Sequence, residues 1–483
     1  MLINSEGETL SDEPYSITEA ALALRAGETS SVALVESAIA RADRDELGVY
    51  LSRFDEQARQ QARRADQERA RGVDRGVLHG IPVAVKDTVA VADGDTTAQS
   101  VVHDRAWAAG RDAPVVARLR QAGAIITGKT TTMEFGCGVP NSTEPFPLPR
   151  NPWDPSRWAG GSSSGTASGV AAGMFLGGLG SDTAGSIRMP AAFCGVTGLM
   201  PSFGRVPKSG CVPLGYSLDR VGPLARTAAD CAALLGVIAG SHPSDPDSAG
   251  VPDLSIGEFG ALSADLTGVR VGVVRRAHFP AGADPELAGV FDCAIDVLVA
   301  CGAEVEEVVL PYWAEVIVAT VVSATCEGLA YHRAVLSRRW DDYFVASRGL
   351  LAKGALVSGA DYVQAQRVRR VAQEAIGELF DRVDAVVGPT AAVGAPLFDE
   401  LVDAAGFQDD ARLFGKVHTP YWNGLGNPVL AVPMGFGAGH LPLSLQIAGP
   451  AFGEAMILRV GEAFQQRTAW HRQLPPTCRT VAA

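Results

Sequence analysis

The chain has 483 residues, of which 47% are hydrophobic and 20% are charged, so it can bury a large core and is neither disordered nor fibrous. Its 54 acidic and 41 basic residues give a formal net charge of −13, which disfavours nucleic acid and anionic membranes as partners. The eight cysteines form no CxxC pair and no cluster with histidines at metal-ligand spacing, which indicates isolated thiols in a reducing compartment. The first residues are acidic and polar rather than basic and apolar, so we expect no leader and a soluble, cytoplasmic protein.

The predicted elements begin with helices, because apolar residues repeat at helical spacing from Leu22 to Ala42. The apolar, β-branched stretch 81–91 follows as a buried strand. A helix that starts near Asp112 and ends at Gly123, and a strand at 124–127, come next. Strand, helix and strand in this order indicate a layered α/β fold.

The rest of the chain continues the alternation. Residues 160–186 are predicted to form a glycine-rich loop, a tightly packed small-residue helix and a second glycine-rich turn. Strands are predicted at 269–274 and 303–310 around a helix at 285–300. Two further strands near the C-terminus precede a helix at 454–466.

Residues 123–130 (GAIITGKT) satisfy the phosphate-loop pattern GxxxxGK[ST]. That pattern binds phosphates when a strand precedes the first glycine and a loop follows it. Here Gly123 ends a helix and an apolar strand follows, so the order is reversed. A nucleotide site around Lys129 is therefore an alternative that the context disfavours.

Residues 161–165 (GSSSG) satisfy GxSxG, the nucleophile elbow of serine hydrolases, with Ser163 as nucleophile. The elbow requires a hydrophobic strand immediately before it, whereas a loop sequence, NPWDPSRWA, precedes it here. His418, His440 and His471 are available to complete a Ser-His-Asp triad. An esterase of this kind is the second alternative.

Another arrangement supplies a nucleophile, a base and donors for an oxyanion. Ser186 follows small residues in SDTAGSIRMP, where Ala184 and Gly185 allow successive backbone N–H groups to form an anion nest. Lys86 lies in an apolar strand, and burial lowers a lysine pKa by several units, which gives a neutral proton acceptor. Taken alone, Lys86 is equally consistent with a buried ion pair to Asp87.

Together these stretches resemble the amidase signature family. The resemblance rests on GIPVAVKD (80–87), GGSSSGTASG (160–169), GSDTAGSIRMPAAFCGVTG (180–198) and SLDRVGPLART (217–227), and it covers nearly the whole chain. It implies an α/β/α fold, in which a large mixed twisted sheet is flanked by helices. The expected segments of this single compact domain are 1–75 (helical, packed on the core), 76–240 (core with the catalytic triad), 241–312 (linker and α/β part), 313–382 (helical, shaping the pocket) and 383–483 (strands and a helix that complete the sheet).

The resemblance further implies hydrolysis of a carboxylic amide by a Ser–cis-Ser–Lys triad, with no cofactor and no metal. Matched by position, Lys86 is the base, Ser162 the proton relay, and Ser186 the nucleophile that forms an acyl-enzyme. The Gly161–Ser162 peptide bond is then expected to be cis. The implied oxyanion donors are the backbone N–H groups of Thr183, Ala184, Gly185 and Ser186. The groups implied to hold the loops are Ser163, Asp182 and Arg188.

Departures from the family pattern bear on the substrate. Leu350 and Lys416 stand near positions where the transamidosome branch is expected to carry an arginine and an aspartate, so a glutaminyl-tRNA amidotransferase subunit is disfavoured. An apolar pocket would suit aryl or alkyl amides, and also esters or urethanes. We expect a small-molecule amide as the partner of a monomer or homodimer. The aromatic candidates for the pocket wall are Phe146, Trp158, Tyr421 and Trp422.

Overall fold

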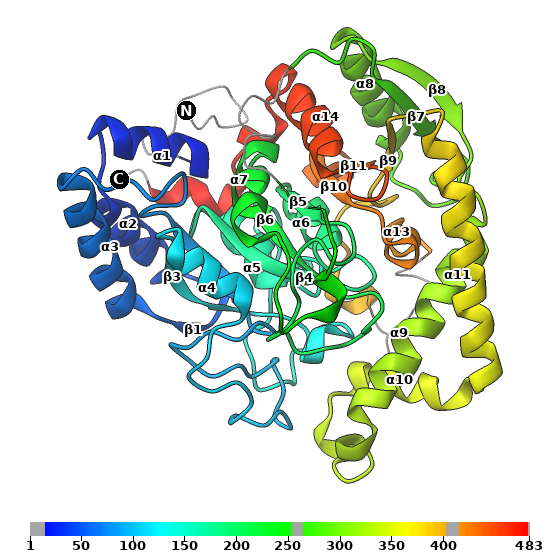
Figure 1. Ribbon diagram of the computed structural model, residues 1–483, viewed down its shortest axis with the longest axis horizontal. Helices are drawn as coiled ribbons and strands as arrows, with labels where there is room; N and C mark the ends of the chain where they lie inside the picture. The colour runs from blue at the N-terminus through cyan, green and yellow to red at the C-terminus, as the bar shows by residue number, and fades with distance from the viewer. Residues whose placement is uncertain (1–14, 253, 255–263, 402–414, 482–483) are drawn as a thin grey trace.

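The computed structural model describes residues 15–252, 254, 264–401 and 415–481. These residues fold around one 11-stranded mixed sheet that is flanked by helices (Figure 1). The predicted α/β fold with a large mixed sheet between helices is thereby confirmed. The segment 241–312, predicted to contain a linker, lies partly outside the described residues.

The order of strands in the sheet differs from their order in the chain. The strands are β1 (Tyr50–Arg53), β2 (Pro82–Lys86), β3 (Ile125–Thr130), β4 (Gly177–Asp182), β5 (Thr197–Met200), β6 (Arg220–Ala225), β7 (Arg270–Val274), β8 (Glu304–Val308), β9 (Ala385–Pro389), β10 (Val429–Phe436) and β11 (Pro442–Ala448). Across the sheet they run β1-β3-β2-β4-β6-β5-β10-β11-β9-β7-β8. β2 is parallel to both β3 and β4, so the carboxyl ends of β2 and β4 meet at one edge of the sheet.

Several of the helices begin at a capping serine or threonine. The α-helices are α1 (Ile17–Ala26), α2 (Ser31–Ala42), α3 (Asp55–Ala70), α4 (Pro114–Gln121), α5 (Ser164–Ala171), α6 (Arg188–Cys194), α7 (Ala228–Ile238), α8 (Leu287–Ala300), α9 (Trp313–Leu336), α10 (Val345–Lys353), α11 (Gly359–Phe380), α13 (Pro420–Leu425) and α14 (Glu454–Arg467). Ser16 and Ser30 cap α1 and α2, because each hydroxyl accepts a backbone N–H three residues further on. α4 begins at Pro114, whose fixed φ suits the first helical turn.

Three elements differ from the prediction. The stretch 160–186, predicted to end in a glycine-rich turn, instead contains the central strand β4 at 177–182, which pairs with β2 and β6. Residues 50–53 form the edge strand β1, antiparallel to β3, inside the segment expected to be helical. All four of its residues are half-buried, so it lacks the alternation that marks a strand in the sequence. The strand predicted at 81–91 ends at Lys86, because the chain turns there and the N–H of Val89 donates to the Lys86 carbonyl.

The segment 313–382 is helical, as predicted. α9 packs against α10, α11 and α13, and Figure 1 shows α9, α10 and α11 along one side of the molecule. Among the described helices, α9 alone is long and apolar enough to cross a membrane by length and composition. It nevertheless forms polar contacts with other parts of the described fold, since Glu327 of α9 accepts hydrogen bonds from Ser217 and from Tyr362 of α11.

Candidate active site

Lys86, the last residue of β2, is fully buried. Its Nζ donates to Ser162 Oγ at 2.7 Å and to Ser181 Oγ at 2.9 Å. Burial penalises the ammonium form and lowers the pKa of Lys86 to about 8. A neutral amine beside a serine hydroxyl is therefore accessible in mildly alkaline water.

Asp87 occupies a different environment from its neighbour. Its Oδ1 lies 3.0 Å from Lys129 Nζ, and both side chains are fully buried. The alternative of an ion pair between Lys86 and Asp87 is therefore wrong. The phosphate-loop alternative is also wrong, because residues 125–130 form strand β3 and the charge of Lys129 is bound to Asp87 rather than exposed to a ligand.

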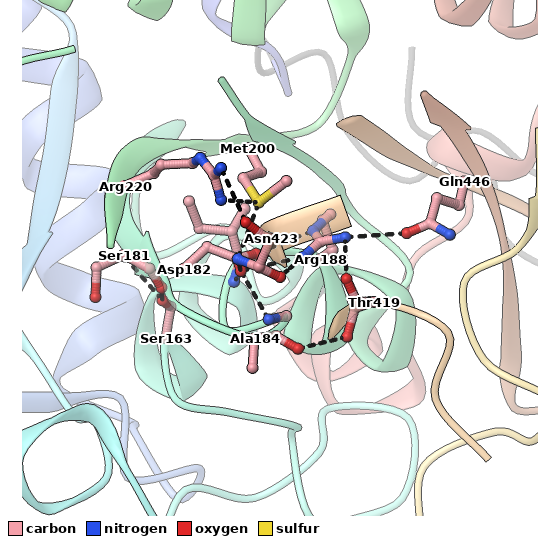
Figure 2. A network of polar contacts seen from close by, with 12 residues as sticks. Ser163, Ser181, Asp182, Ala184, Arg188, Met200, Arg220, Thr419, Asn423 and Gln446 are labelled. Carbon is pink, nitrogen blue, oxygen red and sulfur yellow. Dashed lines mark hydrogen bonds and ion pairs between the residues drawn. The ribbon is translucent and has the colours of Figure 1, made fainter. Parts of the chain in front are cut away.

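Ser162 and Ser163 point in different directions. The Gly161–Ser162 peptide bond is cis, as predicted. The Ser163 hydroxyl donates to the Ser181 carbonyl and accepts the Ser181 N–H, both at 3.2 Å, so it ties the loop to β4 (Figure 2). Ser163 is buried, and turns and bends rather than a strand precede it. The nucleophile-elbow alternative at Ser163 therefore lacks the strand that it requires.

The histidines offered for a Ser-His-Asp triad are bound elsewhere. His418 Nε2 contacts the carbonyl of His278 at 3.0 Å. His440 stacks on Phe436 with ring centroids 4.1 Å apart. His471 is buried, and burial lowers its pKa to about 3. None of the three has a serine partner within the described residues.

Ser186 lies in the turn between β4 and α6. Gly185 has a φ of 133°, and a Cβ there would lie 2.0 Å from Thr419 Oγ1, so the turn requires glycine. The Thr419 hydroxyl donates to the Ala184 carbonyl at 2.8 Å and fixes the turn from the other side. In this geometry Ser186 and Ser162 line the same cavity.

One of the four predicted oxyanion donors is already occupied. The N–H of Gly185 donates to Asp182 Oδ1 at 2.7 Å, because the carboxylate lies under the turn and binds the nest itself. Within the described residues, the N–H groups of Thr183, Ala184 and Ser186 have no hydrogen-bond partner. The set of available donors is therefore these three rather than four.

A buried polar network supports the turn from below (Figure 2). Arg188 Nε lies 3.0 Å from Asp182 Oδ2, and Arg188 also donates to the Thr419 carbonyl and to Gln446 Oε1. Asn423 donates to Asp182 Oδ1 at 2.8 Å. Burial raises the pKa of Asp182, but the charge of Arg188 and these hydrogen bonds outweigh it and lower the pKa to about 2. Asp182 and Arg188 thus lie where supports of the loop were predicted.

The cavity beside Ser162 and Ser186 is mainly apolar, and α9 and α10 contribute part of its wall. Of the predicted aromatic candidates, only Trp158 lines it, whereas Tyr421 and Trp422 pack in a core cluster with α9 and α11. Leu350 lies on its wall, but Lys416 lines a separate cavity of about 350 Å³. The other residues around the cavity include Gly136, Cys137, Gly138, Met189, Leu214, Val321, Ala324, Thr325 and Lys353.

Ser181 is a contact of the site that the sequence motifs did not reveal. In a glycine-rich stretch, a serine is more typical of a spacer than of a functional group. No signal in the sequence marks Ser181, because its contact with Lys86 arises from the parallel pairing of β4 with β2. No three histidine, cysteine or acidic side chains gather as a metal site in the described part of the chain.

Comparison with known proteins identifies the family. The family model described as Amidase matches residues 33–458. The chain belongs to the amidase signature family. A glutamyl-tRNA(Gln) amidotransferase subunit from Chromohalobacter salexigens is 40% identical over 95% of this chain and 98% of the relative.

Two solved structures superpose closely on this chain. The peptide amidase of Stenotrophomonas maltophilia has a TM-score of 0.82 and 28% identity, covering 94% of this chain and 98% of that chain. A 6-aminohexanoate cyclic dimer hydrolase has a TM-score of 0.83 and 27% identity, covering 96% and 99%. The protein is thus an amidase-signature amidohydrolase.

Proposed function

We propose that this protein hydrolyses the C–N bond of a carboxylic amide through an acyl-enzyme on Ser186. The observation that carries the proposal is the 2.7 Å contact of Lys86 Nζ with Ser162 Oγ, beside a cavity that Ser162 shares with Ser186. Burial of Lys86 and the absence of an ion pair to it among the described residues favour the neutral amine that a general base requires.

The chemistry follows as a proton relay. Lys86 accepts the proton of Ser162, and Ser162 accepts that of Ser186 as Ser186 Oγ attacks the carbonyl carbon. The N–H groups of Thr183, Ala184 and Ser186 stabilise the oxyanion. The same relay in reverse protonates the leaving nitrogen, and the C–N bond breaks. Water then attacks the ester by the same route and releases the carboxylate.

The cavity wall indicates an uncharged, apolar substrate. Trp158, Met189, Leu214 and Val321 present hydrocarbon or ring surface, and burying such surface contributes about 25 cal/mol per Å². Aryl and alkyl amides fit this lining, and esters and urethanes present the same carbonyl to Ser186. We expect the protein to hydrolyse esters and urethanes as well.

An amidotransferase component that releases ammonia from glutamine is the second candidate, favoured by the 40% identity to the Chromohalobacter salexigens protein. Glutamine carries an α-carboxylate and an α-ammonium group, which are costly to bury without charged partners. The wall offers Leu350 and other apolar side chains, and Lys353 is the charged residue on it. The lining therefore supports an apolar amide over glutamine.

Ammonia release from hexanamide, benzamide and L-glutamine tests both candidates. The wild type should hydrolyse an apolar amide, and Ser186→Ala should lose at least about a thousandfold in kcat. Ser168→Ala is the matched control, because Ser168 is also buried and its hydroxyl contacts only the Arg150 carbonyl. Release from glutamine alone would support the second candidate, and an active Ser186→Ala variant would refute both.

A further inference from the structure

Lys86 Nζ lies between two serine hydroxyls that come from different parts of the chain. Ser162 precedes α5, whereas Ser181 belongs to β4. Within the described residues the amine forms no ion pair, and the titratable groups that act on it from around the site are Cys137, Asp182, Cys211 and Asp219. The two hydroxyls are thus the hydrogen-bonding partners of this buried amine.

A neutral amine has one lone pair and two N–H bonds. To accept the proton of Ser162, the amine must point its lone pair at Ser162 Oγ, so its N–H bonds need acceptors elsewhere. Ser181 Oγ, 2.9 Å from Nζ, is an acceptor in the required position. Without it, the amine can rotate and turn an N–H toward Ser162, which makes the relay unproductive.

Ser181 is itself held firmly. Its N–H and carbonyl both bond the Ser163 hydroxyl, and residue 181 pairs with Val221 of the antiparallel strand β6. Figure 2 shows Ser163 and Ser181 in this contact beside Asp182. A hydroxyl that a strand holds in place can fix the rotation of a lysine amine group about its terminal bond, whereas a hydroxyl on a free loop cannot.

We propose that Ser181 is a positioning residue that orients the Lys86 amine toward Ser162. The inference rests on the proposed function, because Ser181 can have this role only if Lys86 is the base. Since the Ser181 oxygen also accepts from the ammonium form, its removal should lower the pKa of Lys86. It should also slow the proton transfer at every pH. A role limited to folding would not shift the pH profile.

The pH dependence of covalent labelling by a fluorophosphonate probe tests this without knowledge of the substrate. The rate of Ser186 modification is followed by intact mass for the wild type and for four variants. Ser181→Ala and Ser181→Val should react at least tenfold more slowly on the alkaline plateau, with the ascending limb displaced to lower pH. Ser181→Thr keeps the hydroxyl and should stay close to the wild type, and so should the buried control Ser168→Ala.

The threonine and valine side chains differ only by a hydroxyl in place of a methyl group. A general folding defect would therefore affect both variants alike and could not explain a difference between their labelling rates. Equal rates for the two, or an unshifted limb in Ser181→Val, would overturn the inference while leaving the proposed function intact. If the probe does not label Ser186 of the wild type, the proposed function is wrong. The proposed role of Ser181 is then wrong as well.

Discussion

Lys86 and Asp87 are neighbours in the chain, yet their charged groups lie in separate environments. The amine of Lys86 contacts two hydroxyls, whereas the carboxylate of Asp87 lies 3.0 Å from Lys129. Adjacent side chains of a strand point to opposite faces, and the end of β2 retains this alternation. The separation keeps a carboxylate away from Lys86, so burial can lower its pKa to about 8.

Activity should therefore depend on the neutral form of Lys86. Because the amine must be unprotonated to act as a base, kcat/KM should rise with pH through about 8. Lys86→Ala should lose at least about a thousandfold. A pH–rate profile with an apolar amide checks this. An ascending limb near pH 6.5 that disappears in His418→Ala would instead favour histidine.

Removing the buried lysine should stabilise the fold while abolishing activity. A pKa lowered from 10.5 to about 8 corresponds to a penalty of about 3 kcal/mol for the charged form. Two lost hydrogen bonds offset about 1–2 kcal/mol of this. Urea unfolding at pH 6 should show Lys86→Met to be more stable than the wild type by about 1–2 kcal/mol.

The sign of this effect follows from proton linkage. Below pH 8 both the folded and the unfolded wild type carry the proton, so the penalty is present in full. Between about pH 8 and 10.5 the folded wild type has lost this proton while the unfolded chain still carries it. The free energy of unfolding of the wild type therefore rises with pH relative to that of Lys86→Met. A variant that is less stable than the wild type at pH 6 would contradict the proposed cost of burying Lys86.

The network below the nucleophile turn should act as a unit. Asp182→Asn leaves the Arg188 guanidinium buried without its carboxylate and should cost about 3–5 kcal/mol. Arg188→Met should cost a similar amount, and the double variant should cost less than the sum. Chemical unfolding midpoints of the four proteins measure the coupling. Additive losses would show that the two side chains do not support each other.

The turn at Gly185 should tolerate no side chain. Gly185→Ala places a Cβ 2.0 Å from Thr419 Oγ1 and strains a backbone with φ of 133°, so the turn must move. We expect activity to fall at least a hundredfold with a modest change in thermal midpoint. Gly377→Ala, in α11 with nothing within 4 Å of the added Cβ, is the control and should remain active.

Much of this site could be predicted from the sequence because its residues lie in short motifs. The cis bond before Ser162 follows from the family pattern, and the separation of Asp87 from Lys86 follows from strand alternation. Ser181 could not be found in this way, since its contact with Lys86 depends on β2 and β4 being adjacent. Parallel pairing between distant strands leaves no periodic mark in either one.

The pocket was harder to predict than the triad. Tyr421 and Trp422 are large and apolar, which suits a cavity wall and a core equally well, and the structure places them in the core. The hydrogen bond from the Gly185 N–H to Asp182 could not be predicted either, because the motif does not show that the Asp182 carboxylate lies beneath the turn. Both depend on tertiary packing rather than local sequence.

The nucleophile can be identified directly by trapping the acyl-enzyme. The protein is mixed with p-nitrophenyl butyrate, quenched in acid and digested with trypsin, and the acyl group is located by fragmentation of the peptide spanning 158–188. That peptide contains both Ser163 and Ser186, so fragmentation decides between them. We predict a single butyryl group on Ser186 that is absent from Ser186→Ala and retained by Ser163→Ala. Butyryl on Ser163, with Ser186→Ala still acylated, would contradict the account.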